Sequence, residues 1–177
     1  MKKIIFILIS ITISIAAHAQ SNFAIAEGKL VWQKVYETDK NLEDIADALF
    51  NTGKLQDIGI ANERITCKIT PCEIDIAGAG FSRGSVPMYF ALNNLTAFVT
   101  IQAKDGRYRV TIERMNLIGN TTTGLSTVGD STELDFYAIK KGELSKAVSR
   151  YIEPIIGRQL DILFTLTESS ILDNDNW

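Results

Sequence analysis

The stretch FVTIQAKDGRYRVTIE, residues 98–113, sets the fold, because it has the pattern of a complete β-hairpin. Asp105-Gly106 at its centre is a strong signal for a two-residue turn, since alternating apolar and polar side chains flank it on both sides. Such a turn fixes the register of the two strands. The residues expected to face each other are Lys104 and Arg107, Gln102 and Arg109, Thr100 and Thr111, Phe98 and Glu113, Ala103 and Tyr108, Ile101 and Val110, and Val99 and Ile112.

The two faces of this hairpin differ in polarity. The set that contains Val110 is apolar and is expected to face the core, whereas the set that contains Arg109 is mostly polar and is expected to face outward. Two interpretations of the polar face stay open. It is either a solvated surface of the sheet or a face that contacts a ligand through Phe98, Gln102, Arg107 and Arg109.

The first 19 residues have the pattern of a secretory signal peptide. Two lysines precede an apolar run over residues 4–15, and Ala17-His18-Ala19 then forms an A-x-A cleavage pattern. The alternative is a membrane anchor, but the apolar run has 12 residues and a bilayer of about 30 Å needs about 20. We therefore expect a mature chain over 20–177, periplasmic or secreted, with no membrane span after cleavage.

Removal of the signal peptide changes the chemical inventory. It takes away two lysines and His18, which leaves 158 residues, 16 basic against 21 acidic, and no histidine. Without imidazole, catalytic dyads that use histidine and histidine ligands for zinc are excluded. A formal net charge of −5 argues against nucleic acid as a partner, because such binding depends on neutralising phosphates. The length suits one domain.

The two cysteines lie close together in ITCKITPCEIDI, residues 65–76. Export favours a disulfide between Cys67 and Cys72, with residues 68–71 as a loop between them. Closing so short a loop stabilises by roughly 2 kcal/mol at most. The alternative is two buried thiols that do not meet, and a redox-active pair is disfavoured because the C-x-x-C spacing is missing.

The remaining sequence predicts an alternation of strands and helices. The acidic tail, 172–177, is expected to fray. Pro154 is expected to kink or split the C-terminal helix. The expected segments are a leader over 20–28, a strand over 29–37, a helix within 41–53 capped by Asn41, a strand over 64–70 with a partner over 73–78, sheet over 86–117, a loop over 119–131, a strand over 132–139 and a helix within 142–170.

Three segments resemble a known family: GKLVWQKVYETDKNLEDIADAL (28–49), IAGAGFSRG (76–84) and KDGRYRVTIERMN (104–116), followed by an amphipathic helix. The chain is similar over about 28–168 to a family of exported bacterial proteins of unknown function, whose fold is like that of the TATA-box-binding protein. The resemblance implies an α+β domain over 20–177, in which helices pack on one face of a curved antiparallel sheet. It implies no activity, substrate or site residue.

Two function classes stay open. The first is a non-enzymatic binding or protein-interaction module of the cell envelope, with an unknown protein or small-molecule partner and no cofactor. The second is a hydrolase that works through carboxylates, which requires two facing acids in a cleft. Acids do recur at Glu43, Asp44, Asp47, Asp173 and Asp175, but helix capping and a solvated terminus account for them. The sequence DNDN lacks the distal glutamate of a calcium loop, and we expect no metal.

Overall fold

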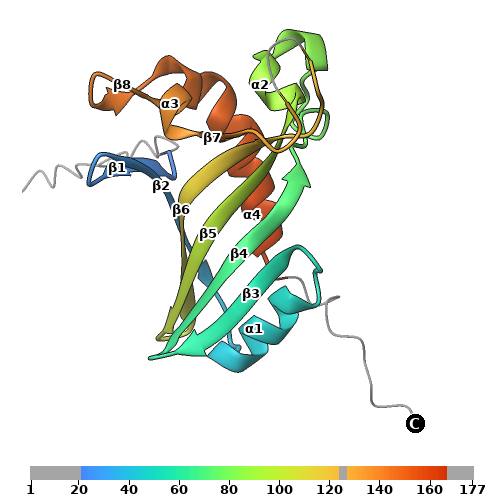
Figure 1. Cartoon of the computed structure of the whole chain (residues 1–177). Helices are drawn as coiled ribbons and strands as arrows, with labels where there is room; N and C mark the ends of the chain where they lie inside the picture. Colours follow the sequence, from blue (N-terminus) through green and yellow to red (C-terminus); the bar gives the residue numbers. More distant parts are fainter. Residues whose placement is uncertain (1–20, 124–126, 167–177) are drawn as a thin grey trace, which may run out of the picture.

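The computed structural model of the chain describes residues 21–123 and 127–166, so the predicted signal peptide and acidic tail lie outside the described residues. Figure 1 shows a long, twisted sheet crossed by the C-terminal helix. The elements in chain order are β1 (Phe23–Ala26), β2 (Lys29–Glu37), α1 (Leu42–Phe50), β3 (Leu55–Ala61), β4 (Arg64–Glu73), η1 (Arg83–Ser85), α2 (Met88–Ala91), β5 (Asn93–Lys104), β6 (Arg107–Gly119), β7 (Ser131–Glu133), α3 (Asp135–Ala138), β8 (Ile139–Lys140), β9 (Glu143–Leu144), the π-helical segment η2 (Val148–Gly157) and α4 (Arg158–Phe164).

The main sheet is antiparallel throughout, with the strand order β1-β2-β6-β5-β4-β3 and β7 paired to the far end of β6. The β5–β6 hairpin lies at its centre, and all seven residue pairs predicted from the Asp105-Gly106 turn are confirmed. Val110 and Ile112 are fully buried, whereas Arg107 and Arg109 are exposed, so the predicted faces are also confirmed. The α+β class and the curved sheet with helices on one face agree with the expectation.

Two-residue turns close four hairpins, and both residues of each turn have positive φ. This backbone gives the primed turn that matches the twist of the flanking strands. Glycine occupies the second position in three of the four turns, whereas the β3–β4 turn has Glu63 there, at φ 58°. The four turns are Glu27-Gly28, Asn62-Glu63, Asp105-Gly106 and Lys141-Gly142.

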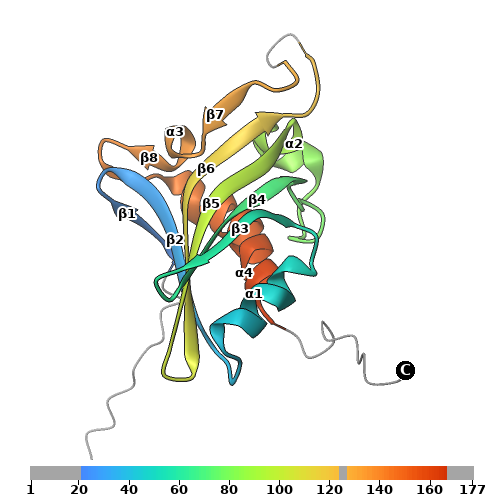
Figure 2. The same cartoon turned by 60° about the horizontal axis from the view of Figure 1, so that its bottom comes forward.

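The core lies between one face of the sheet and the helices. Figures 1 and 2 show η2–α4 running along that face, with α1 beside its C-terminal end. The α1 helix begins where predicted: the Asn41 side chain accepts a hydrogen bond of 2.9 Å from the backbone N–H of Asp44. The largest fully buried core side chains come from the sheet, α1, α2 and α4, and they include Trp32, Leu30, Tyr108, Ile101, Ile112, Ile65, Ile69, Ile45, Leu49, Phe90 and Phe164.

The C-terminal helix continues through Pro154, so of the two outcomes predicted there, a kink or a split, the split is wrong. Proline lacks an N–H and its ring crowds the carbonyl four residues earlier, so an ordinary α-helical turn fails there. The chain adopts a π-helical stretch instead, in which the N–H of Arg158 donates to the carbonyl of Glu153, five residues back. The wider turn keeps Ile152, Ile155 and Ile156 buried against the sheet.

Other expectations fail at the sheet edges. The leader over 20–28 contains the edge strand β1, and the partner of β4 is β3, not residues 73–78. Short helices interrupt the sheet predicted over 86–117 and the strand predicted over 132–139. The β3 pairing shifts register between Gln56 and Gly59, which explains why alternation in the sequence does not reveal this strand.

Candidate functional site: the uncovered face of the sheet

The sheet face opposite the core, hereafter the outer face, carries no covering helix in the described part of the chain (Figures 1 and 2). Its side chains are exposed or half-buried, in contrast to the buried residues that alternate with them. Val35 is the most exposed apolar side chain among them, at 53%. The residues of the outer face are Gln33, Val35, Arg64, Thr66, Lys68, Phe98, Thr100, Gln102, Arg107, Arg109, Thr111 and Glu113.

Strand register arranges these side chains in rows across the sheet. Val35 is paired with Arg109, Arg109 with Gln102, and Gln102 with Arg64, so one row crosses β2, β6, β5 and β4. Because neighbouring strands are about 4.8 Å apart, the Cα atoms of Arg64 and Arg109, two strands from each other, are roughly 10 Å apart. The next row consists of Gln33, Thr111, Thr100 and Thr66.

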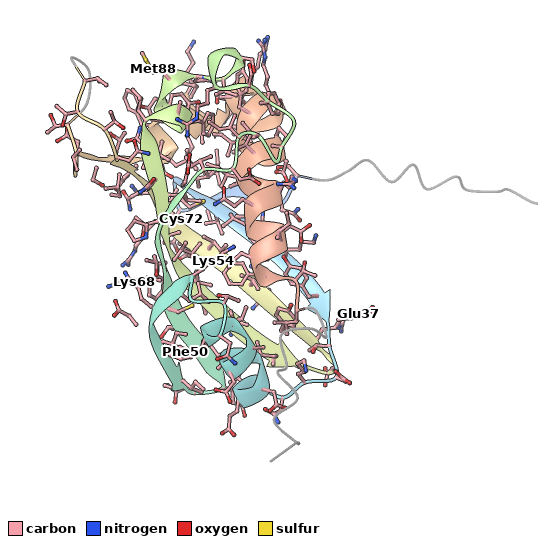
Figure 3. The ribbon with its side chains drawn as sticks, turned by 90° about the vertical axis from the view of Figure 1, so that its right-hand side faces the viewer. Glu37, Phe50, Lys54, Lys68, Cys72 and Met88 are labelled. Carbon is pink, nitrogen blue, oxygen red and sulfur yellow. The ribbon has the colours of Figure 1, made fainter. Side chains whose placement is uncertain are left out.

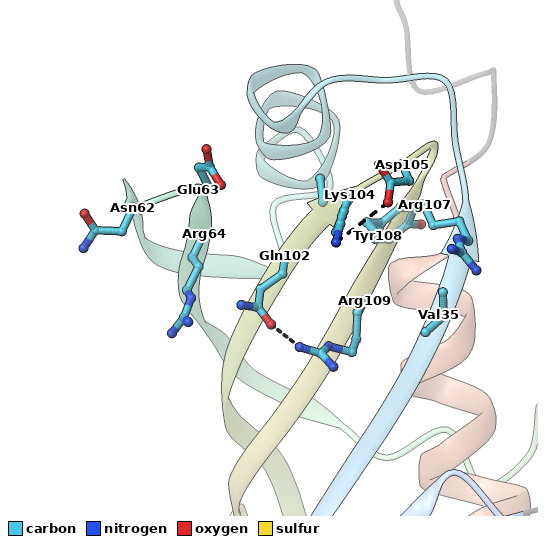
Figure 4. Close-up of a pocket in the computed structure, with 11 residues that line it drawn as sticks. Val35, Asn62, Glu63, Arg64, Gln102, Lys104, Asp105, Arg107, Tyr108 and Arg109 are labelled. Carbon is cyan, nitrogen blue, oxygen red and sulfur yellow. Dashed lines mark hydrogen bonds and ion pairs between the residues drawn. The ribbon is translucent and has the colours of Figure 1, made fainter.

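A hollow of about 600 Å³ opens at the end of the outer face where two hairpin turns meet. Figure 4 shows Arg64, Gln102 and Arg109 side by side on three adjacent strands. We call this hollow the arginine hollow, and its lining residues are Val35, Asn62, Glu63, Arg64, Gln102, Ala103, Lys104, Asp105, Arg107, Tyr108 and Arg109.

The arginines of the hollow have no carboxylate partner within the described residues. Arg109 donates to the side-chain oxygen of Gln102, a neutral acceptor. Lys104 lies 3.9 Å from Asp105, and both side chains are more than two-thirds exposed, so this contact contributes little. In Figure 4 the carboxylate of Glu63 points away from the guanidinium of Arg64. The hollow therefore keeps a local excess of positive charge.

The structure brings together three of the four residues predicted for a ligand-contacting face. Gln102, Arg107 and Arg109 line the arginine hollow, whereas Phe98 lies two rows away, opposite Glu113. A β-bulge at Arg114, with φ 51°, places that guanidinium 5.7 Å from the centre of the Phe98 ring. The guanidinium of Arg114 therefore already lies over the Phe98 ring.

Sequence reasoning missed Arg64 and Val35. Arg64 reaches the hollow because the Asn62-Glu63 turn places it as the first residue of β4, opposite Gln102. The Asn62 position is a turn signal, but the pairing of β4 with β5 joins residues almost 40 positions apart. No local pattern in the sequence reports that pairing.

The predicted loop between Cys67 and Cys72 is wrong, and the structure contains both as free thiols. Both residues lie in the continuous strand β4, and five residues of extended chain separate their Cα atoms by roughly 13 Å or more. A disulfide requires Cα atoms less than about 7 Å apart. Cys67 is buried in the core, and the Cys72 sulfur accepts a hydrogen bond from Gln159 of α4, so Cys72 also faces the helix side; Figure 3 shows Cys72 and Lys68 on β4. Burial raises the pKa of the Cys67 thiol to about 12.

The acids that the hydrolase interpretation requires would have to face each other in a cleft of the described part of the chain. No charged side chain is buried in that part of the chain. A second hollow, of about 510 Å³, is lined by Glu27, Glu113, Glu133 and Asp135, among others. Lys29 lies between two of these acids, 2.7 Å from Glu133 and 3.5 Å from Asp135. The described residues also contain no group of three or more potential metal ligands of the His, Cys, Asp or Glu type.

A polar cluster on the other side of the sheet fastens the end of α4 to β2. Asp161 accepts hydrogen bonds from the ammonium group of Lys34, at 2.6 Å, and from the hydroxyl of Tyr36, at 3.0 Å. Burial first, and then the charge of Asp161, raise the pKa of Tyr36 above its ordinary value. Tyr36 also stacks on Tyr108 with ring centres 5.0 Å apart. These contacts explain the cluster as a structural anchor.

The comparisons with known proteins concern the fold. The sequence matches no family model and none of the curated proteins. The structure is similar to that of a DUF4468 family protein from Bacteroides ovatus ATCC 8483, with 13% identity over 88% of this chain and 94% of the other and a TM-score of 0.51. A TBP-like protein from Parabacteroides distasonis ATCC 8503 gives 10% identity over 80% and 94%, with a TM-score of 0.48. The likeness to the DUF4468 family protein, at 13% identity, concerns the fold alone. In the described chain, no helix has both the length and the apolarity to cross a membrane.

Proposed function

We propose that this chain is an exported, non-enzymatic binding module of the bacterial cell envelope, and that the outer face is its contact surface. The observation that carries the proposal is the asymmetry of the sheet. One face is filled by helices, while the other presents rows of exposed and half-buried side chains that end in the arginine hollow. On this proposal, the uncovered face, with its mixed apolar and polar side chains, is the surface on which a partner docks.

Export is supported by the sequence of residues 1–19. The lysine pair, the apolar run and Ala17-His18-Ala19 form the three parts of a secretory signal. The expected mature protein begins at Gln20 and is periplasmic or secreted. Mass spectrometry of the protein recovered from the envelope and the medium tests this directly, and a full-length mass beginning at Met1 in that material contradicts it.

Site-specific photo-crosslinking tests the contact surface. A photoreactive residue placed at Thr100, in the middle of the outer face, is expected to form adducts in cells that produce the protein. The same residue at Glu43, exposed on α1 on the helix side, is the matched control and is expected to form none. Adducts at Glu43 without adducts at Thr100, or none at either position, contradict the proposal.

A further inference from the structure

The seven arginines of the chain fall into three groups: those in ion pairs, those over aromatic rings, and those with neither contact. Arg83 and Arg158 form ion pairs with Glu73 and Asp75, while Arg114 and Arg150 lie over aromatic rings. The other three, Arg64, Arg107 and Arg109, form no ion pair and no ring contact within the described residues, although Glu37 is the cross-strand neighbour of Arg107, and all three line the arginine hollow. This convergence is notable in a chain whose acids outnumber its bases, 21 to 18.

The local charge balance of the hollow favours an anion. Four cations line it, the three arginines and Lys104, against the two acids Glu63 and Asp105. The planar, forked guanidinium group matches the geometry of a carboxylate better than an ammonium group does. An exposed arginine that already faces outward binds such a group without first breaking an internal ion pair.

The spacing of the arginines fits an extended peptide. Arg107 and Arg109 are two residues apart on one face of β6, so their Cα atoms are about 6.7 Å apart. Side chains on one side of an extended peptide repeat at the same distance. Arg64 stands two strands away from Arg109, and Gln102 between them offers an amide for hydrogen bonds, while Val35 adds an apolar contact.

We propose that the arginine hollow binds an acidic polypeptide segment in extended conformation, with carboxylates on alternate residues. The inference rests on the proposed function and names the chemical class of the partner. A nucleic acid fits less well, because Glu113 on the outer face and the net charge of the chain oppose a long phosphate backbone.

Fluorescence anisotropy of the mature protein with synthetic peptides tests the inference. The probe is a labelled, end-blocked peptide of alternating glutamate and serine, and the comparison peptide has the same composition with its glutamates in one block. We expect tighter binding of the alternating peptide, by at least threefold, and a loss of affinity as salt rises. Equal affinities, or no binding of the alternating peptide, overturn the inference.

Charge-matched variants show where the peptide binds. The double variant Arg64→Gln/Arg109→Gln is expected to weaken binding at least tenfold. The control Lys141→Gln/Lys146→Gln removes the same charge from exposed positions outside the hollow and is expected to change affinity less than twofold. An equal loss in both variants means non-specific attraction and overturns the inference, provided that melting curves show both variants folded.

The outcomes separate this inference from the proposed function. Tighter binding of a polyuronate or an oligonucleotide than of the alternating peptide overturns the choice of polypeptide. Crosslinks at Thr100 together with failure of the peptide assay sink only the inference. Absence of crosslinks at Thr100 sinks the proposed function, even if the hollow binds the peptide.

Discussion

Val110 and Arg109 are adjacent in β6 and lie on opposite faces of the sheet, so alanine substitutions at the two positions compare those faces directly. Val110 is fully buried in the core, opposite Ile101. Val110→Ala removes two methyl groups, and their transfer from water contributes about 1.6 kcal/mol at about 0.8 kcal/mol each. The space left behind adds to this cost, so we expect a loss of about 2 kcal/mol in the free energy of unfolding.

Arg109→Ala is expected to cost about 0.5 kcal/mol at most, as exposed substitutions usually do. Its side chain donates a hydrogen bond to the neutral Gln102 and forms no ion pair within the described residues, so no ion pair is lost. Thermal melts by circular dichroism measure both effects. For a domain of this size, 1 kcal/mol shifts Tm by about 2–4 °C, so Val110→Ala is expected to lower Tm by about 4–8 °C and Arg109→Ala by about 2 °C or less.

The reverse order of these two shifts would refute the assignment of the faces. A large loss from Arg109→Ala with a small loss from Val110→Ala means that the arginine side is packed. Small losses from both substitutions mean that the central hairpin contributes little to the core. Urea titrations with an unchanged slope confirm that the variants differ in stability and not in the compactness of the unfolded state.

Three further predictions concern single residues. The unfolded, unreduced protein should titrate two free thiols, and titration of no thiol supports the disulfide instead. Burial raises the pKa of both thiols, but native Cys67 should react more slowly than Cys72, since Cys67 is fully buried and Cys72 is only partly buried. Glu63→Gly should stabilise by about 0.5–1 kcal/mol in urea unfolding, because Glu63 has a positive φ of 58°, and a loss of stability contradicts this assignment of the turn. The hydrogen bond from the N–H of Gly78, more than any other contact, lowers the pKa of Asp75 below 3.8 in the folded state. The ionised Asp75 therefore stabilises the fold above pH 3.8, and this contribution is lost as the pH falls through the lower, folded-state pKa. Asp75→Asn should make stability fall less steeply at acid pH, and an unchanged acid dependence contradicts this prediction.

The position of the cysteines illustrates the limit of arguments from spacing. The interval between Cys67 and Cys72 is compatible with a hairpin loop and with a continuous strand. Only the pairing of β4 with β3 and β5 on its two edges selects the strand, since paired neighbours keep the segment extended. Pro71 permits this because the ladder shifts register between Ile69 and Cys72, where its missing N–H is tolerated.

The sequence by itself determined what depends on short-range chemistry. Asp105-Gly106 set the register of the central hairpin, alternation set its two faces, and Asn41 with the spacing of Leu42, Ile45 and Leu49 set α1. Each of these features is specified by residues that are neighbours in the chain, so the local pattern contains the information.

Only the tertiary structure decided how distant segments meet. Arg64 lies opposite Gln102 and two strands from Arg109 because β4 pairs with β5, and the helix continues through Pro154 in π-helical form with the isoleucines around it buried against the sheet. Strand neighbours far apart in the chain are chosen by the burial of whole faces, which is a property of the assembled core and of no single stretch. The arginine hollow is therefore invisible in the sequence, although each of its arginines can be read there.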